Sequence, residues 1–122
     1  MAIKPVDKGP YDITVDDTLP VILSITVGNA QKGGNVIKLD GTTIGKGDIL
    51  NFPIGLGKDL RGKTLKITTN VLDVNPSSNR ISITHYFQNG TPTVFQYPEP
   101  GDDPGVDKDG DIYSLVAKYK FI

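Results

Sequence analysis

The sequence has no cysteine and no tryptophan, and it contains one histidine and one methionine among its 122 residues. The lack of cysteine excludes disulfide bonds, thiolate zinc sites and cysteine nucleophiles. No apolar run approaches the roughly 18 residues that a membrane-spanning helix needs. The start of the sequence also lacks the apolar stretch of a signal peptide. These absences predict a soluble polypeptide without a membrane span, and they leave its compartment open.

The chain also lacks an excess of charge of either sign. It carries 13 basic and 14 acidic residues, for a formal net charge of −1. Such a balance produces no overall field that would attract nucleic acid or an anionic membrane, so we expect neither partner. Apolar residues make up 37%, whereas glycine and proline are frequent, at 14 and 9 residues, and follow no repeat. This composition indicates many turns between short strands in a single domain.

Strict alternation of side chains over 65–87 is the strongest structural signal in the chain. A period of two is typical of a β-strand with one buried face. The pattern runs through two segments, 65–71 and 81–87, and the turn-like sequence NPSSN separates them at 75–79. We therefore predict a β-hairpin here. The side chains that share its inward face are Leu65, Ile67, Thr69, Val71, Ile81, Ile83, His85 and Phe87.

Further short strands are predicted by alternation and by the turn residues between them, such as Asp40-Gly41 and Asn89-Gly90. These strands lie at 11–15, 20–27, 36–39, 42–44, 48–54, 93–97 and 112–122, with a loop at 29–35. The predicted fold class is all-β, an antiparallel β-sandwich of about eight strands with Greek-key or jelly-roll-like connections. We expect residues 1–10 to form an extended N-terminal arm and residues 11–122 to form the domain.

The segment Gly57–Thr64 matches the phosphate-binding pattern G-x-x-x-x-G-K-[ST] at every defined position. In nucleotide-binding proteins this loop follows a buried strand and opens a helix, whose N-terminal amides hold the phosphates. Here the residues that follow, 65–71, alternate as a strand, and no helical pattern begins there. We therefore interpret the segment as a glycine-rich turn with exposed basic residues.

An acidic loop at 97–111 is the best candidate for a ligand site. Six carboxylates and a single lysine lie between Glu99 and Asp111. Asp107, Asp109 and Asp111 occupy every second position around Gly110, which predicts a calcium site because Ca²⁺ prefers six to eight oxygen ligands. The spacing is not that of an EF-hand, since no glutamate follows at the twelfth position. The alternative is a solvated loop that discourages pairing of sheet edges.

Opposite charges also predict a contact between copies of the chain. Lys58, Arg61 and Lys63 form a local basic cluster, and Asp102 and Asp103 belong to the acidic loop. A head-to-tail contact between these two sets would build a ring or a filament. The alternative is that both sets are ordinary solvated charges. No aromatic residues interleave the basic cluster, as they do in many sites for single-stranded nucleic acid.

No group in the sequence is marked as catalytic. We interpret His85 as a core histidine held by hydrogen bonds and not as a general base. No nucleophile motif is present. The chain has one glutamate and no tryptophan, whereas a sugar-cleaving cleft needs a pair of carboxylates and usually aromatic rings that stack on the sugar. We expect a non-enzymatic structural or protein-interaction module without a resident cofactor, such as a subunit of a larger bacterial or phage assembly. The alternative is a calcium- or carbohydrate-binding module that uses the acidic loop.

Overall fold

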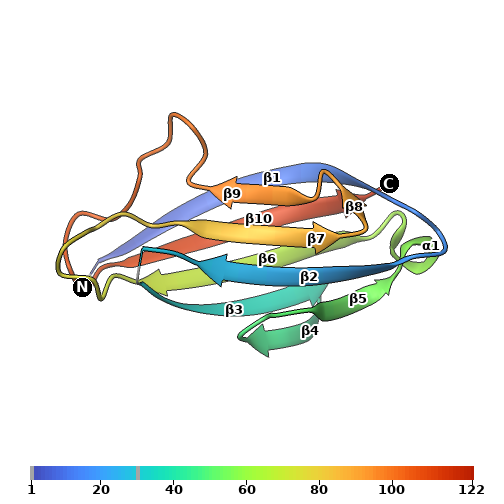
Figure 1. Cartoon of the computed structure of the whole chain (residues 1–122), viewed down its shortest axis with the longest axis horizontal. Helices are drawn as coiled ribbons and strands as arrows, with labels where there is room; N and C mark the ends of the chain where they lie inside the picture. Colours follow the sequence, from blue (N-terminus) through green and yellow to red (C-terminus); the bar gives the residue numbers. More distant parts are fainter. Residues whose placement is uncertain (1, 30) are drawn as a thin grey trace.

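Two β-sheets pack face to face in the computed structural model, which describes residues 2–29 and 31–122 (Figure 1). The strands are β1 (Ile3–Val15), β2 (Pro20–Val27), β3 (Lys32–Leu39), β4 (Thr42–Gly47), β5 (Phe52–Leu56), β6 (Thr64–Leu72), β7 (Ile83–Gln88), β8 (Gly90–Thr91), β9 (Val94–Tyr97) and β10 (Ile112–Phe121). A short helix, α1 (Gly57–Leu60), connects β5 to β6. Among the described residues, no helix has the length and apolar character needed to cross a bilayer.

The expected all-β sandwich is confirmed. One sheet has six strands in the order β4-β3-β6-β10-β1-β8, and the other has four in the order β5-β2-β7-β9. One pair departs from the expected antiparallel arrangement, because β1 runs parallel to β10, with Ile3 opposite Ile112 and Ile13 opposite Phe121. These two strands are far apart in the sequence, so no local pattern sets their relative direction. β10 thereby lies between β1 and β6, inside the six-stranded sheet.

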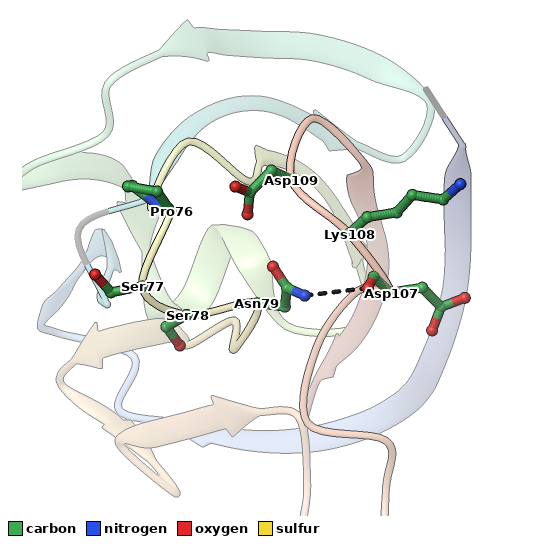
Figure 2. Close-up of a pocket in the computed structure, with 7 residues that line it drawn as sticks. All are labelled: Pro76, Ser77, Ser78, Asn79, Asp107, Lys108 and Asp109. Carbon is green, nitrogen blue, oxygen red and sulfur yellow. Dashed lines mark hydrogen bonds between the residues drawn. The ribbon is translucent and has the colours of Figure 1, made fainter.

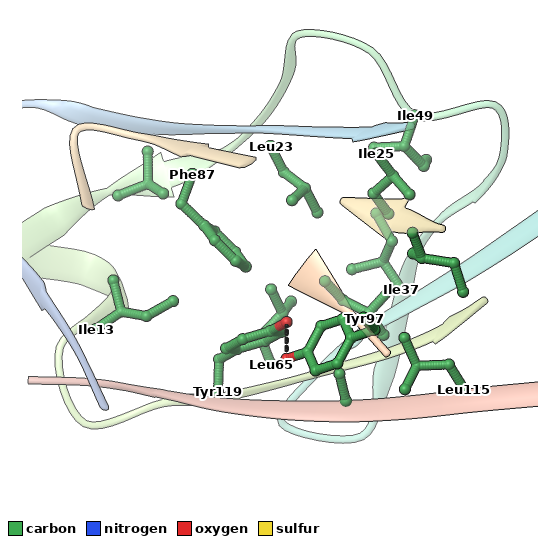
Figure 3. Packing of buried hydrophobic residues seen from close by; sticks show 14 of the residues in the cluster. Ile13, Leu23, Ile25, Ile37, Ile49, Leu65, Phe87, Tyr97, Leu115 and Tyr119 are labelled. Atoms are coloured by element: carbon green, nitrogen blue, oxygen red, sulfur yellow. Dashed lines mark hydrogen bonds between the residues drawn. The ribbon is translucent and has the colours of Figure 1, made fainter. Parts of the chain in front are cut away.

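The hydrophobic core lies between the two sheets, where inward side chains of both meet (Figure 3). Along β6 and β10 every second residue is buried, as the period of two predicts. Aromatic rings fill part of the core: the ring centroids of Phe87 and Phe95 each lie 4.8 Å from that of Tyr119. Burial of one large apolar side chain contributes roughly 1.5–3 kcal/mol, so this packing holds the sheets together.

The hairpin predicted over 65–87 is wrong, although both of its strands exist. β6 pairs with β3 and β10 in the six-stranded sheet, whereas β7 pairs with β2 and β9 in the four-stranded sheet. The loop at 73–82 therefore crosses from one sheet to the other, over the roughly 10 Å that separates packed sheets. Because the inward faces of β6 and β7 meet the same core from opposite sides, their alternation resembles that of a hairpin. The pattern predicts which side chains are buried, but not which strands pair.

Three boundaries also differ from the prediction. Residues 3–10, expected in an extended arm, form the first part of β1 and pair with β10. β5 covers Phe52–Leu56 and not 48–54. β3 begins at Lys32 and so includes Gly33, which was expected in a loop. A Cβ on Gly33 would lie 2.6 Å from Cγ2 of Val27, so this glycine permits close packing inside a strand.

The tight turn predicted at Asp40-Gly41 is confirmed. It connects the antiparallel strands β3 and β4. Its two residues have positive φ values of 47° and 84°, as a two-residue type I′ turn requires.

Candidate functional site

The segment that matches the phosphate-binding pattern has the wrong structural context for a nucleotide. Its first half forms α1, and Thr64 begins β6, so a strand follows the pattern as predicted. In a phosphate site, backbone N–H groups of this segment would point at the ligand, but here two of them donate hydrogen bonds to carbonyl groups of the chain itself. Gly62 donates its N–H to the carbonyl of Phe121 over 2.7 Å, and Lys63 donates to that of Leu60 over 2.8 Å. The segment closes one end of the sandwich and forms no cradle of free amides.

Lysines of β1 neutralise part of the acidic loop. Lys8 Nζ lies 2.7 Å from Asp102 and 3.0 Å from Glu99, and Lys4 Nζ lies 2.6 Å from Asp103. Hydrogen bonds from Tyr11 and Lys8 lower the pKa of Glu99. The hydrogen bond from Lys8 likewise lowers the pKa of Asp102. The loop is thus held against β1, and Asp102 and Asp103 already have partners within the chain.

The three aspartates predicted to bind calcium do not share one site. The carboxylate of Asp111 is buried and accepts hydrogen bonds from the backbone N–H groups of Ala2 and Lys108, at 2.9 and 3.3 Å. Asp107 and Asp109 are exposed and line the surface depression drawn in Figure 2. In the described part of the chain, no three histidine or acidic side chains converge closely enough to hold a metal ion. Calcium binding by this set of residues stays a prediction.

The basic cluster lies at the end of the sandwich that carries α1. Arg61 forms an ion pair with Asp17. Lys58 and Lys63 are exposed, and neither forms an ion pair with another described residue. The acidic loop follows β9 and lies toward the opposite end, where the chain begins (Figure 1). A head-to-tail contact between copies would therefore join opposite ends of two molecules, and it stays a prediction.

His85 lies in the core, where the alternation places it, and it is fully shielded from solvent. Its ring connects the two sheets: Nε2 lies 3.2 Å from the hydroxyl of Thr69, and Nδ1 lies 2.7 Å from the hydroxyl of Tyr119. Burial lowers the pKa of His85 to about 3, so the ring is neutral at physiological pH. A histidine held in this way contributes to the core and lies out of reach of a substrate in solution.

The hydrogen bonds around His85 allow only one direction of donation. Asn35 donates from Nδ2 to a backbone carbonyl of β4, so its Oδ1 accepts from Thr69 over 2.8 Å. Thr69 has one hydroxyl proton, and it therefore accepts from Nε2–H of His85. Nδ1 is then the acceptor for Tyr119, whose oxygen accepts from the hydroxyl of Tyr97 over 2.8 Å (Figure 3). It follows that His85 is the neutral Nε2–H tautomer.

Charged residues are divided unequally between the two sheets. The strands of the four-stranded sheet contain no aspartate, glutamate, lysine or arginine. In the six-stranded sheet, lysines occur on β1, β3, β4, β6 and β10. The residue types of each strand are visible in the sequence, but the sequence does not show which strands share a sheet.

The outer face of the four-stranded sheet therefore presents uncharged side chains to solvent. Tyr86 and Val94 lie directly opposite each other on β7 and β9, and Ser24 of β2 faces Tyr86 from the other side. Tyr86 is 41% exposed and Val94 is 46% exposed. Single exposed apolar residues are common on proteins, but here the whole row is uncharged. We call the surface centred on Ser24, Tyr86 and Val94 the neutral face.

The outer face of the six-stranded sheet is cationic. Lys38, Lys66 and Lys118 lie directly opposite one another on β3, β6 and β10, and we call them the lysine row. The Cβ atoms of facing residues are about 4.5–5.5 Å apart, and like charges in such positions repel each other. None of the three forms an ion pair with another described residue.

Comparison of the chain with protein-family models, with curated proteins and with solved structures gives no match. Function is therefore inferred from the residues and their geometry.

Proposed function

We propose that the chain is a non-enzymatic interaction module, a subunit that associates with further copies of itself through the neutral face. The observation that supports this is the lack of any aspartate, glutamate, lysine or arginine in the strands of the four-stranded sheet, whose one histidine, His85, is buried and neutral. Interfaces between protein chains are depleted of charge at their centre and enriched in tyrosine. Burying the neutral face would remove no ionised side chain from water, so its desolvation costs little.

A second copy of the chain is the partner that suits this surface best. A two-fold contact places the same residues on both sides, so any charge within it would meet a like charge. The neutral face has no such charge, whereas the lysine row would repel itself. Tyr86 supplies a large and rather rigid ring that packs well against a neighbour. The net charge of −1 is also too small to keep copies apart.

The test is the mass of the protein in solution, measured by light scattering or native mass spectrometry over a range of concentrations. We expect the unchanged chain to form a dimer or a larger assembly. Tyr86→Lys and Val94→Lys each place a charge at the centre of the neutral face. Each variant should raise the concentration needed for association by about tenfold or more, because central aromatic and apolar contacts dominate most interfaces.

A matched control adds the same charge elsewhere. Thr14 is exposed on β1, so Thr14→Lys should leave the association unchanged. Circular dichroism shows whether each variant is folded. A monomer at every concentration, or association that survives both Tyr86→Lys and Val94→Lys, would contradict the proposal.

A further inference from the structure

A buried carboxylate without a partner lies where the loops at 73–82 and 105–111 meet. Asp73 is 2% exposed, and neither of its oxygens has a hydrogen-bond partner among the described residues. In that part of the chain, these two oxygens are the only buried side-chain polar atoms left unpaired. An ionised carboxylate in such a place is strongly unfavourable unless a cation or hydrogen-bond donors compensate it. A bound cation would supply the compensation that the described residues do not provide.

A second carboxylate, that of Asp111, belongs to the neighbouring strand at the same level. Asp73 donates its N–H to the carbonyl of Asp111 over 3.0 Å, and Gly110 donates its N–H to the carbonyl of Asp73 over 2.9 Å. The two aspartates thus extend the ladder of β6 and β10, in which Val71 faces Tyr113. Both continue the inward, buried alternation of their strands. The backbones of the two aspartates are thus hydrogen-bonded to each other, and both side chains are shielded from solvent.

Neither of these two acids forms an ion pair with a described residue. Asp111 is 4% exposed, and the N–H groups of Ala2 and Lys108 hold its two oxygens in place. Carboxylate oxygens that are fixed and shielded in this way are the ligands that hard divalent cations take.

We propose that Asp73 and Asp111 bind a divalent cation such as Ca²⁺, which ties the ends of β6 and β10 together. Ca²⁺ also accepts water and backbone carbonyl oxygens as ligands, so a site with two carboxylates is sufficient. Asp111 also lines a surface depression, together with Asp103 and Asp107. Binding here requires no association between copies through the neutral face. It differs from the site predicted in the acidic loop by its dependence on Asp73.

The test compares thermal unfolding of chelator-treated protein with and without millimolar CaCl₂, together with a calorimetric titration. The unchanged chain should bind about one ion and gain about 5 °C or more in Tm, since a ligand that binds only the folded state stabilises it. Asp73→Asn keeps the shape of the side chain and removes its charge. Without calcium this variant should melt above the unchanged chain, because it no longer buries an unpaired charge. Adding calcium should not change its Tm.

Asp109→Asn is the matched control, because it removes an exposed acid from the same end of the molecule. This variant should keep the full calcium response. A response that is lost in Asp109→Asn and kept in Asp73→Asn would assign the ion to the exposed loop and overturn the proposal. The same Tm for the unchanged chain in chelator, Ca²⁺ and Mg²⁺ would overturn it as well.

A second measurement on the unchanged chain covers the case in which Asp73→Asn does not fold. Tb³⁺ replaces Ca²⁺ at oxygen sites and emits light when a nearby tyrosine is excited. Tyr113 lies two residues from Asp111 on the same buried face of β10. We expect terbium emission that Ca²⁺ displaces and that weakens in Tyr113→Phe. No emission would count against the site. Because these readouts do not depend on the mass in solution, they separate this proposal from self-association.

Discussion

Tyr119 donates a hydrogen bond from its hydroxyl to Nδ1 of His85 over 2.7 Å, from the six-stranded sheet to the four-stranded sheet. The same oxygen accepts a hydrogen bond from Tyr97, so a single phenol links β10 to both β7 and β9. Polar groups in a core lower stability unless they are paired, and here each is paired. The hydrogen bonds therefore fix the position of one sheet against the other, which apolar packing alone does less specifically.

Tyr119→Phe should lower the free energy of unfolding by about 2–4 kcal/mol in urea unfolding. The substitution keeps the ring but removes the donor to His85 and the acceptor for Tyr97, and each unpaired group costs about 1–3 kcal/mol. The matched control is Tyr113→Phe, on the same strand. The ring of Tyr113 is also buried, but the residue lines a surface depression and its hydroxyl makes no hydrogen bond to another described residue, so its loss should stay below about 1 kcal/mol. Equal losses in the two variants would contradict this assignment.

Acid should weaken the fold in a way that depends on His85. Burial lowers the pKa of this residue to about 3 in the folded chain, against an ordinary value of 6.5. Between these two pH values the unfolded chain binds a proton that the folded chain does not, so the free energy of unfolding decreases as the pH falls. The contribution is complete above about pH 6.5 and disappears progressively toward pH 3. At pH 5 about 2 kcal/mol of it is lost.

His85→Gln isolates this contribution, because glutamine retains a donor and an acceptor but does not titrate. We expect the loss of stability between pH 8 and pH 5 to be about 2 kcal/mol smaller in the variant than in the unchanged chain. Urea unfolding at both pH values provides the measurement. The same pH dependence in both proteins would mean that the folded chain accepts the proton as readily as the unfolded chain.

Burial could be predicted from the sequence because a period of two determines which side chains share a face. Ile67, His85 and Leu115 are all buried, as their alternation predicts. Strand pairing could not be predicted, because it depends on contacts between segments that are distant in the sequence. Nothing in the residues of β1 shows that it runs parallel to β10. Nor do the residues 65–87 show that their two strands belong to different sheets.

The candidate sites were predictable only in part for the same reason. The acidic loop can be recognised from composition alone, because six acids lie close together in the sequence. Asp73 has no acidic neighbour nearby in the sequence, so composition does not single it out. Its position opposite Asp111 arises only when β6 pairs with β10. Likewise, each strand of the neutral face is visibly uncharged, yet the surface exists only because these strands share a sheet.

Gly57→Ala should destabilise the fold by more than about 2 kcal/mol, as overpacking against backbone does. A Cβ at this position would lie 1.9 Å from the carbonyl oxygen of Asp16. Gly57 also donates its N–H to the carbonyl of Leu19 over 3.0 Å, so the backbone cannot move away without losing that bond. The first glycine of the phosphate-like pattern is therefore required for close contact between segments of this fold.

Gly34→Ala is the control for this prediction, because a Cβ on Gly34 would have no atom within 4 Å. The substitution should change the free energy of unfolding by no more than about 1 kcal/mol. Alanine lowers the conformational entropy of the unfolded chain, and this effect on its own would raise the free energy of unfolding. Thermal or urea unfolding of both variants provides the comparison. Similar values for the two would show that the contact with Asp16 relaxes easily.

Lys66→Glu should stabilise the protein at low ionic strength. Lys66 lies between Lys38 and Lys118 on adjacent strands, so glutamate would replace two repulsions with two attractions. Each cross-strand charge pair contributes roughly 0.2–1 kcal/mol, which predicts a gain of about 1 kcal/mol in urea unfolding. In about 1 M NaCl the screening length is about 3 Å, and most of the gain should vanish.

Lys32→Glu makes the same change opposite Leu72 and should be nearly neutral at both salt concentrations. A destabilised Lys66→Glu at low salt would mean that the three ammonium groups already have favourable surroundings.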